Sequence, residues 1–271
     1  MPIRSDVRPA ITSRPRIIAI ANQKGGVGKS TTAVNLGTAL AAVEKKVLIV
    51  DIDPQGNATT GLGVERRPGM RSVYEVLTDD LPIMDAAVRT SIPGLAVARS
   101  SIDLVGAELE LIDMESRAFR LKRAFERIDE DLDYVLIDCP PALGLLTLNA
   151  LSAAHAVLVP LQCEYYALEG LSQLVKTIER VKRTFNSTLE IQGVVLTMFD
   201  KRNNLCSMVA NDVRSHFGDK VYDTVIPRNV RVSEAPSHGK PVLVYDLACA
   251  GSQAYMHLAS EVLQRERGLS A

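Results

Sequence analysis

The residues best suited to chemistry by type and spacing form the run Q-K-G-G-V-G-K-S-T-T at positions 23–32. A phosphate-binding loop has the pattern G-x-x-x-x-G-K-[ST] between a strand and a helix, and Gly28, Lys29 and Ser30 match its last three positions. Glycines allow the backbone to bend so that its N–H groups and the start of the helix point at a phosphate chain. We therefore expect the Lys29 ammonium to contact the β- and γ-phosphates of a nucleotide and the Ser30 hydroxyl to ligate Mg²⁺.

The run departs from the usual pattern at its start. Gln23 stands where the first glycine is expected, and an additional lysine, Lys24, follows it. A glycine-rich turn without chemical function is the alternative interpretation, but the preceding strand, the lysine, the hydroxyl and the following helix all favour phosphate binding. The residues of this loop expected to bind the nucleotide are Lys24, Gly25, Gly26, Val27, Gly28, Lys29, Ser30 and Thr31.

Two carboxylates come at the end of the second apolar run, in the sequence D-I-D-P-Q-G-N at 51–57. We expect Asp51 and Asp53 at the carboxyl edge of the sheet, which is where open α/β sheets bind ligands. A site that hydrolyses a nucleotide needs a carboxylate to orient the metal and a positioned water molecule. For Asp53, the alternative is a turn-forming aspartate before Pro54.

A third carboxylate, Asp138, follows four residues with apolar side chains or ring carbons in the run Y-V-L-I-D-C-P-P at 134–141. This is the Walker B pattern. An acidic residue at the end of a buried strand beside a phosphate loop can hold Mg²⁺ through water. The alternative is that Asp138 only caps the end of its strand.

Apolar runs rich in β-branched residues or leucine alternate with stretches that fit a helix. The predicted strands are 16–22, 46–51, 95–99, 134–138, 155–160 and 191–198. The predicted helices include Ser30 to Val43, Leu143 to Ala153, Leu168 to Phe185 and Leu205 to Phe217, and the irregular region from Gly61 to Met114 is expected to hold short helices. This alternation predicts an α/β fold: a doubly wound, mostly parallel twisted sheet flanked by helices.

Neither an internal repeat nor a linker divides the chain, so we expect a single domain at 16–267 between a short basic N-terminal tail, 1–15, and a C-terminal tail, 268–271. The N-terminal tail carries charge and proline where a signal peptide would need an apolar core. Four cysteines are scattered without a C-x-x-C pair, which indicates free thiols in a reducing cytosol. Four histidines lack metal-ligand spacing, so Mg²⁺ with a nucleotide is the only metal expected.

The charge sum is close to zero, with 31 basic and 32 acidic residues and a net charge of −1. Binding of nucleic acid or of a membrane through bulk charge is therefore excluded, and any such binding must come from a local patch. The segment 201–240 has seven basic and four acidic residues, a local balance of +3. Taken alone, so small an excess is more typical of a solvated face.

The form K-G-G-x-G-K-[ST] at 24–30 resembles the deviant Walker A motif of the ParA/MinD superfamily of P-loop ATPases. The chain is similar to the ParA (Soj-like) chromosome-partitioning branch from about Arg16 to Leu263. The resemblance implies that Lys24 reaches across a nucleotide-sandwich homodimer to the partner's phosphates, where a second cation offsets the charge that develops in phosphoryl transfer. It also implies that Asp53 positions or activates the attacking water and reaches Mg²⁺ through water, with Asp51 in support.

The segment V-I-P-R-N-V-R-V-S-E-A-P-S-H-G-K-P at 225–241 has no spacing that reveals a role, and an extended loop is the default interpretation. It is similar to a stretch of ParA-type proteins, I-P-R-[NSD]-x-x-x-x-E-A-P-x-x-G. The resemblance implies that Pro227 and Asn229 contact the adenine of ATP, whose edge offers both hydrogen-bond donors and acceptors.

The same resemblance gives the basic segment a candidate partner, because ParA-type proteins bind double-stranded DNA without sequence preference as ATP-bound dimers. The matching stretches are F-D-K-R at 199–202 and R-N-V-R at 228–231. We expect Arg202 and Arg231 to contact DNA, together with Arg228 and Lys240. Such binding depends on phosphate contacts and falls steeply with salt.

The function expected from the resemblance is a bacterial, cytoplasmic and nucleoid-associated DNA-segregation ATPase, whose slow hydrolysis of ATP is stimulated by a ParB-like centromere-binding protein. A ParA-like positioner of another cargo is an alternative. A MinD-like division-site regulator on the membrane is another, but the sequence L-A-S-E-V-L-Q-R-E-R-G-L-S-A at 258–271 fits an amphipathic anchor poorly, so stable membrane association is not expected. A redox protein of the nitrogenase-iron-protein type would need cysteines spaced for a cluster.

Overall fold

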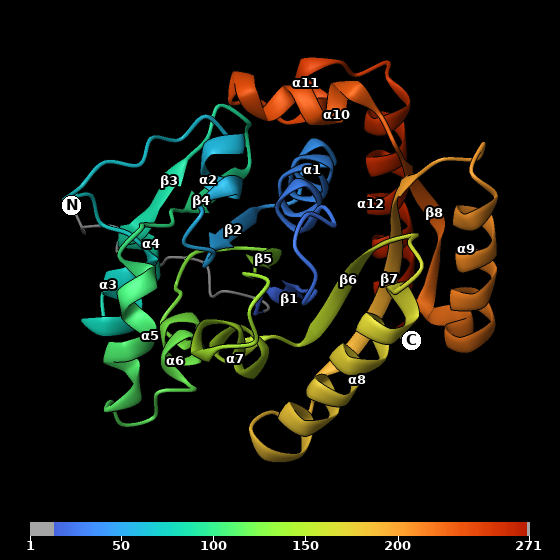
Figure 1. Ribbon diagram of the computed structural model, residues 1–271. Helices are drawn as coiled ribbons and strands as arrows, with labels where there is room; N and C mark the ends of the chain where they lie inside the picture. The colour runs from blue at the N-terminus through green and yellow to red at the C-terminus, as the bar shows by residue number, and fades with distance from the viewer. Residues whose placement is uncertain (1–13, 270–271) are drawn as a thin grey trace, which may run out of the picture.

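Eight strands form one twisted sheet in the computed structural model, which describes residues 14–269 (Figure 1). Their order across the sheet is β3-β4-β2-β5-β1-β6-β7-β8. Neighbouring strands pair in parallel, apart from β3 and β4, which pair antiparallel. The strands are β1 (Arg16–Ile20), β2 (Val47–Asp51), β3 (Ala87–Arg89), β4 (Leu95–Ala98), β5 (Tyr134–Asp138), β6 (Ala156–Gln162), β7 (Glu190–Phe199) and β8 (Val221–Pro227).

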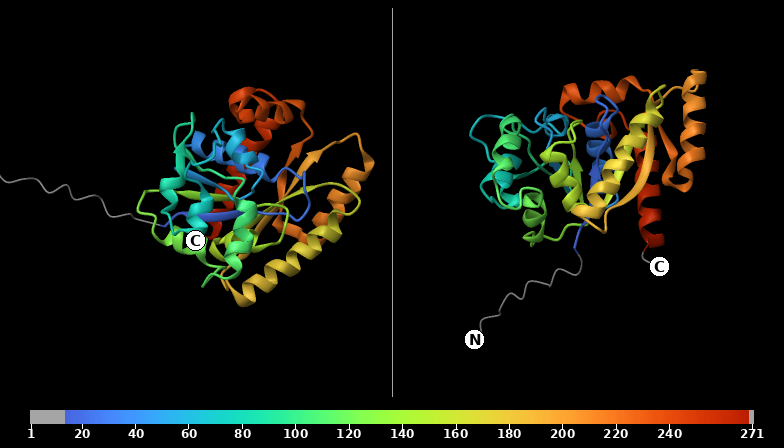
Figure 2. Two further views of the ribbon diagram at one scale, coloured as in Figure 1. Left: turned by 60° about the vertical axis from the view of Figure 1, so that its left-hand side comes forward. Right: turned by 60° about the horizontal axis from the view of Figure 1, so that its bottom comes forward.

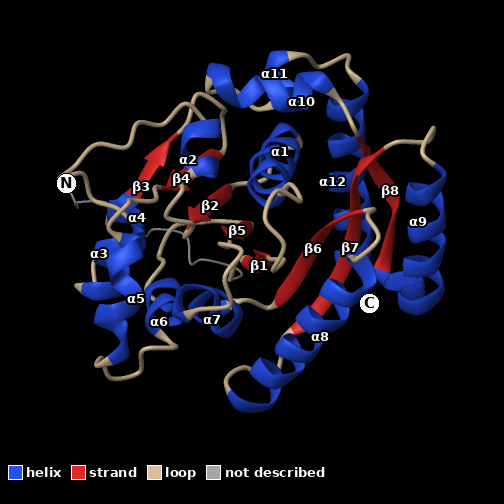
Figure 3. Ribbon diagram, in the orientation of Figure 1, coloured by secondary structure: helices blue, strands red, loops and turns tan. Residues whose placement is uncertain are grey.

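Helices cover both faces of the sheet (Figure 3). They are α1 (Lys29–Ala42), α2 (Asn57–Gly61), α3 (Val73–Thr78), α4 (Ile83–Ala86), α5 (Leu104–Ile112), α6 (Arg120–Glu126), α7 (Leu145–Ala153), α8 (Ala167–Thr184), α9 (Asn204–Phe217), α10 (Val230–Glu234), α11 (Val242–Tyr245) and α12 (Ala250–Leu269), with 3₁₀ turns at Gly218–Lys220 and Ala235–His238. The buried residues of α3 to α9 belong to one core, and those of α1, α11 and α12 belong to a second. The views of Figure 2 show α8 and α12 on opposite sides of the sheet.

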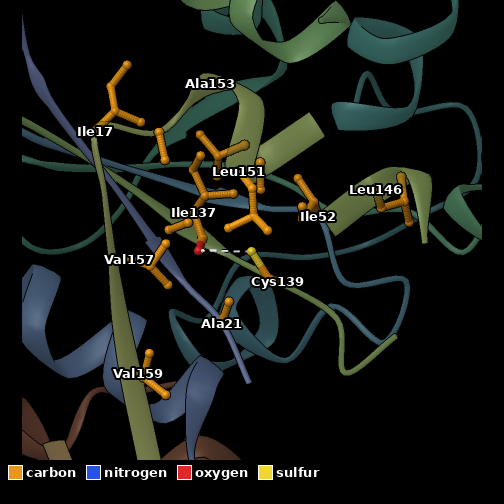
Figure 4. Close-up of a cluster of buried hydrophobic side chains, with 14 of the residues drawn as sticks. Ile17, Ala21, Ile52, Ile137, Cys139, Leu146, Leu151, Ala153, Val157 and Val159 are labelled. Carbon is orange, nitrogen blue, oxygen red and sulfur yellow. Dashed lines mark hydrogen bonds between the residues drawn. The ribbon is translucent and has the colours of Figure 1, made fainter. Parts of the chain in front are cut away.

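The continuous apolar strands follow from this double covering. In β1, Ile17 and Ala19 pack into the first core, whereas Ile18 and Ile20 pack into the second, because successive side chains of a strand point to opposite faces. Figure 4 shows part of the first core, where Ile17 of β1 lies with side chains of β5, α7 and β6. A strand with water on one face would alternate apolar and polar residues instead.

The order of the sheet explains how distant parts of the sequence meet. Strands β2, β5 and β1 are neighbours, and in a parallel sheet their carboxyl ends lie at one edge. The glycine-rich loop follows β1, Asp51 ends β2 and Asp138 ends β5, so the three sequence signals converge there. In Figure 1 the helices α1, α2, α10 and α11 gather at this edge.

The predicted α/β class and doubly wound sheet are confirmed, and each predicted strand and helix is present with its ends shifted by at most two residues. The short helices expected between Gly61 and Met114 are present as α3, α4 and α5, but β3 was not predicted there. The default interpretation of 225–241 as an extended loop was wrong, because the segment contains the end of β8, the helix α10 and a 3₁₀ turn. Strand β8 escaped prediction because it is an edge strand whose exposed Asp223 interrupts its apolar pattern.

The structure describes only part of the two tails that were expected at the ends of the domain. Of the expected N-terminal tail, 1–15, only the last two residues lie within the described part of the chain, and residues 270 and 271 of the expected C-terminal tail lie outside it. The helix α12 continues to Leu269, past the expected boundary at 267. Within the described residues, no helix is long and apolar enough to cross a membrane.

Candidate functional site

The loop between β1 and α1 has the backbone geometry of an anion-binding site. Gly26 and Gly28 have φ angles of 74° and 90°, in the left-handed region that costs an L-residue about 1–2 kcal/mol. Gly28 stands at the N-cap of α1 and provides no side-chain oxygen, so no side chain caps the first N–H groups of the helix. These groups and the positive end of the helix dipole are therefore available to an anion.

A cavity of about 420 Å³ opens in front of this loop. It is open to solvent on one side and large enough for the phosphates and part of a nucleotide. Its walls come from the glycine-rich loop, the start of α1, the segment after β2, the segment after β5 and the turn before α11. They include Gly25, Gly26, Gly28, Lys29, Ser30, Thr31, Asp53, Gln55, Asn57, Thr60, Pro141, Met198, Pro236 and Lys240.

Lys29 lies almost wholly buried at the base of the cavity, with 6% of its surface exposed. Its Nζ donates a hydrogen bond to the carbonyl of Lys24 at 3.1 Å, which folds the loop back over the ammonium. Burial lowers the pKa of Lys29, whereas the charges of Asp138 and Asp53 oppose that shift. A desolvated ammonium held in this way interacts strongly with an incoming phosphate.

Lys24 lies on the outer side of the same loop and is half exposed. Its ammonium pairs with the carboxylate of Glu164, in the segment between β6 and α8. The Asn22 side chain accepts a hydrogen bond from the backbone N–H of Lys24 at 3.0 Å, which fixes the base of the lysine. The two lysines therefore differ, because Lys29 points into the cavity and Lys24 is bound to a surface carboxylate.

Asp138 is fully buried, and neither of its carboxylate oxygens has a hydrogen-bond partner among the described residues. Burial raises its pKa well above the ordinary value and the neighbouring Asp51 adds to this shift. The Ser30 hydroxyl lies near the carboxylate without a well-formed hydrogen bond to it and lowers the pKa. A buried carboxylate without partners is costly unless a cation approaches it. A hydrated Mg²⁺ bound to Ser30 and to phosphate oxygens fits this position.

Metal binding at this place would depend on the nucleotide. Within residues 14–269, no group of three or more His, Cys, Asp or Glu side chains is arranged to hold a metal ion. Mg²⁺ readily keeps several waters and takes substrate phosphates as ligands, so such a group is not required. The four cysteines are free, and Cys139, which follows Asp138, packs in the first core (Figure 4).

Asp53 lines the cavity near Ser30 and has 6% of its surface exposed. Its Oδ1 accepts a hydrogen bond from the backbone N–H of Gln55 at 2.9 Å, so the side chain also organises the turn that was its alternative interpretation. The turn role does not exclude the expected role toward water, because a carboxylate can accept several hydrogen bonds. Asp51 is instead fully buried and does not line the cavity.

A second cavity, of about 430 Å³, adjoins the first and shares Gly28, Thr31, Met198 and Pro236 with it. The two residues expected to contact adenine, Pro227 and Asn229, line this second cavity. The Asn229 Oδ1 accepts a hydrogen bond from the backbone N–H of Arg231 at 2.8 Å and caps α10. Only the amide N–H₂ group of Asn229 is then left to donate to a base.

The four residues expected to bind DNA fall into two pairs. Arg228 lines the second cavity and Lys240 lines the first, so both lie at the rim of the candidate nucleotide site. Arg202 and Arg231 are exposed on the surface, but each already has an acidic partner.

The ion pairs of these two arginines differ in geometry. Arg202 holds Asp200 with two hydrogen bonds, of 3.0 and 2.9 Å, and lowers the pKa of that carboxyl to about 2. Arg231 contacts Glu234 at 2.9 Å and Asp246 at 3.5 Å. Exposed pairs of this kind contribute little stability and exchange readily for another anion.

Several residues at this edge were not predicted as part of the site. Asn35 donates from Nδ2 to the Thr31 carbonyl at 2.8 Å, and its Oδ1 accepts from the backbone N–H of Val242 at 2.8 Å, which ties α1 to α11. An asparagine between two apolar residues of the helix, Val34 and Leu36, was the available signal. Glu164 also follows a predicted strand, but nothing in the sequence shows that it pairs with Lys24.

Comparison with known proteins agrees with this geometry. A protein-family model described as "AAA domain" matches residues 15–191. The "Chromosome partitioning protein ParA" of Caulobacter vibrioides is 62% identical over 258 residues, which span 94% of this chain and 97% of the relative. The "Sporulation initiation inhibitor protein Soj" of Bacillus subtilis is 56% identical over 247 residues, which span 91% of this chain and 98% of the relative.

Among solved structures, the fold is similar to that of a cobyrinic acid a,c-diamide synthase from Mycobacterium smegmatis, crystallised with an ATP analogue and magnesium. The TM-score is 0.82 at 39% identity, with 93% of this chain and 96% of that chain covered. The loop at 24–30, the carboxylates that end β2 and β5, and these matches together show that the chain belongs to the ParA/Soj family of chromosome-partitioning P-loop ATPases.

Proposed function

We propose that this chain is a nucleotide-gated switch for DNA segregation. ATP and Mg²⁺ bind at the carboxyl edge of the sheet, the ATP-bound form dimerises and binds double-stranded DNA without sequence preference, and hydrolysis stimulated by a ParB-like partner releases it. The names of the relatives, which are chromosome-partitioning proteins, favour DNA over another cargo. This proposed function places the protein in the cytoplasm, on the nucleoid.

One observation carries the nucleotide part of the proposal. The unpartnered carboxylate of Asp138 lies buried beside Lys29 and Ser30, under a loop whose glycines and bare helix start favour an anion. A cation and an anion that arrive together satisfy both halves of this site, and a nucleotide with its Mg²⁺ is such a pair. In the M. smegmatis structure the bound groups are an ATP analogue and magnesium.

The residues then divide the work of hydrolysis. Lys29 and the backbone N–H groups at 25–31 hold the phosphates, and Ser30 and, through water, Asp138 would hold Mg²⁺. When bound, the ion would neutralise negative charge on the phosphates. Asp53 orients the attacking water from the cavity wall and accepts its proton. Pro227 and Asn229 contact the adenine in the second cavity.

Dimerisation needs Lys24 to leave Glu164. The pair is half exposed, so breaking it costs little free energy. The phosphates of a nucleotide bound to a second copy of the chain then replace Glu164 as the negative partner of Lys24. The cation then stabilises charge that develops at the scissile bond only when the dimer has formed. Hydrolysis is thereby linked to assembly, because each active site is incomplete in the monomer.

DNA binding uses the same exchange of partners. Arg202 and Arg231 replace Asp200 and Glu234 by DNA phosphates, and Arg228 and Lys240 add positive charge at the rim of the nucleotide site. A dimer presents two such sets, which raises the affinity of the particle without changing the charge of either chain. A monomer with a net charge of −1 and paired arginines remains a weak DNA binder.

The proposal is tested with the purified full chain on non-specific double-stranded DNA. Phosphate release is measured with ATP in Mg²⁺ and in EDTA, and retention on DNA is measured with ATP, with ADP and without nucleotide. We expect Mg²⁺-dependent phosphate release and retention with ATP only. Equal retention in all three nucleotide conditions, or no phosphate release with Mg²⁺, would contradict the proposal.

A further inference from the structure

A buried serine from another part of the sheet holds the backbone of Asp53. Ser100 lies just after β4, and its hydroxyl donates a hydrogen bond to the Asp53 carbonyl at 2.5 Å. Ser100 has 2% of its surface exposed and Asp53 has 6%. The same carbonyl also accepts a hydrogen bond from the backbone N–H of Gly56 at 2.8 Å. Ser100 is its side-chain donor from another part of the sheet, and removing the buried hydroxyl would leave Gly56 alone to hold the carbonyl.

Thr59, on α2, joins this serine to the end of β2. The Thr59 hydroxyl donates to Asp51 Oδ2 at 2.6 Å and accepts from the backbone N–H of Ser100 at 3.1 Å. The backbone N–H of Thr59 donates to the same Asp51 oxygen at 2.7 Å. Both capacities of the hydroxyl are therefore in use, and Thr59 is fully buried.

These hydrogen bonds hold the segment that carries Asp53 from two sides. Asp51 lies two residues before Asp53 and accepts a hydrogen bond from the Asp53 N–H at 3.3 Å, while Ser100 holds the Asp53 carbonyl. The segment is thus fixed on both sides of one residue by β2, α2 and the end of β4. Fully satisfied buried networks of this kind hold a single geometry better than separate surface bonds do.

We propose that Thr59 and Ser100 are positioning residues for ATP hydrolysis, which hold the Asp53 carboxylate where it can orient the attacking water. Neither residue is among those that line the two cavities, so both act through Asp53 and without touching the nucleotide. This inference rests on the role proposed for Asp53. A displacement of about 1 Å in such a group is enough to slow a reaction by about 100-fold while the substrate still binds.

The test separates hydrolysis from nucleotide binding in the full chain. Thr59→Val removes the hydroxyl at nearly constant shape, Thr59→Ser restores it, and Ser100→Ala removes only the bond to the Asp53 carbonyl. The kcat for ATP in Mg²⁺, the Kd for a fluorescent ATP analogue and the melting temperature are measured for each. We expect kcat to fall by about tenfold or more in Thr59→Val and Ser100→Ala with Kd within about twofold, and Thr59→Ser to recover most of the activity.

Two matched controls show whether any buried hydroxyl would have the same effect. Ser252 is fully buried on α12 and its hydroxyl donates to the Asp246 carbonyl at 2.6 Å, and Thr38 is buried on α1 with its hydroxyl on the Val34 carbonyl at 2.7 Å. Ser252→Ala and Thr38→Val should lower the melting temperature without the loss of kcat.

The inference is overturned if Thr59→Val and Ser100→Ala keep the wild-type kcat, if their kcat falls only in step with ATP affinity, or if the controls lose as much. A folded Ser100→Ala keeps the inference testable even if Thr59→Val fails to fold. Failure of the proposed function looks different, because the wild-type chain itself would then release no phosphate.

Discussion

Asp51 and Asp138 are direct partners in the register of β2 and β5, so two buried carboxylates stand side by side at the edge of the sheet. Their surroundings differ. Asp51 accepts hydrogen bonds from the N–H and hydroxyl of Thr59 and from the N–H of Asp53, whereas both oxygens of Asp138 have no partner among the described residues. Asp51 therefore organises the backbone around it, and Asp138 fits the proposed role of holding Mg²⁺.

Asp138→Asn should separate these roles. It replaces an unpartnered buried carboxylate by a neutral amide, so the melting temperature without nucleotide should not fall. The stabilisation by ATP with Mg²⁺, which is about 2.7 kcal/mol at 100 times the Kd, should be largely lost. Thermal melting with and without the nucleotide measures both effects.

Asp51→Asn is the matched comparison and should lower the melting temperature in both conditions, because it disturbs the hydrogen bonds to Thr59. Unaltered Mg²⁺-dependent stabilisation of Asp138→Asn would show that this carboxylate holds no metal.

The two lysines of the loop should respond differently to removal. Lys29→Ala loses a buried charged interaction with phosphate and should weaken ATP binding by about 3 kcal/mol, or roughly 100-fold. Lys24→Ala should still bind ATP but should no longer dimerise or hydrolyse it. Equilibrium binding, light scattering and phosphate release distinguish the two, with exposed Lys176→Ala on α8 as the control. Hydrolysis by Lys24→Ala at the wild-type rate would refute the role given to Lys24.

Arg231→Glu and Arg202→Glu should lose DNA binding while the ATP-bound dimer persists. The ion pairs with Glu234 and Asp200 are exposed, so their loss should change stability little. For Arg231→Ala and Arg202→Ala, which retain measurable affinity, the slope of log K against log salt should fall by about 1 for each DNA phosphate that the variant no longer neutralises. Arg183→Glu, on the exposed side of α8, is the control. Undiminished retention of Arg231→Glu and Arg202→Glu would place the DNA-binding surface elsewhere.

His155 should make the fold sensitive to acid. Its Nδ1 accepts a hydrogen bond from the backbone N–H of Ile17 at 3.0 Å, and burial and the nearby Arg16, Arg14 and Lys122 lower its pKa. Since the folded pKa lies below the unfolded value of about 6.5, its contribution is fully present above that value and is lost as the pH falls through the lowered pKa. The melting temperature of the wild type should therefore drop more between pH 7.5 and pH 5.5 than that of His155→Asn. An equal drop in both chains would show that another group is responsible.

The parts of the fold that could be predicted are those with local patterns. They include the apolar runs of β1, β2 and β5 and the glycines before Lys29. These could be recognised because the residues that make up each pattern are adjacent in the sequence. The bonds from Ser100 to Asp53 and from Lys24 to Glu164 join residues 47 and 140 positions apart, so no window of sequence contains them. The strand β8 was missed because its exposed Asp223 interrupts the apolar pattern at the edge of the sheet. The helix α10 was missed because it is short and none of its residues is buried, so it has no apolar periodicity to recognise.

The near-neutral net charge of the chain is matched by local pairing of the basic residues that are expected to bind DNA. Two of the arginines expected to bind DNA are held by acidic neighbours, and the other two basic residues face the candidate nucleotide site. A switch of this kind should bind DNA only when nucleotide and a second copy of the chain are present.

The most direct test of this gating is the behaviour of Asp53→Ala on DNA. The full-length variant is loaded with ATP and Mg²⁺ on immobilised non-specific double-stranded DNA, and its release is followed after free ATP is washed away, with exposed Asp129→Ala as the control. On the proposed role of Asp53, the variant binds ATP without orienting the attacking water. It should therefore form a stable dimer and stay on the DNA, while the wild type and the control leave as ATP is hydrolysed. An Asp53→Ala chain that hydrolyses ATP at the wild-type rate, or stays monomeric and off the DNA with ATP, would contradict the proposal.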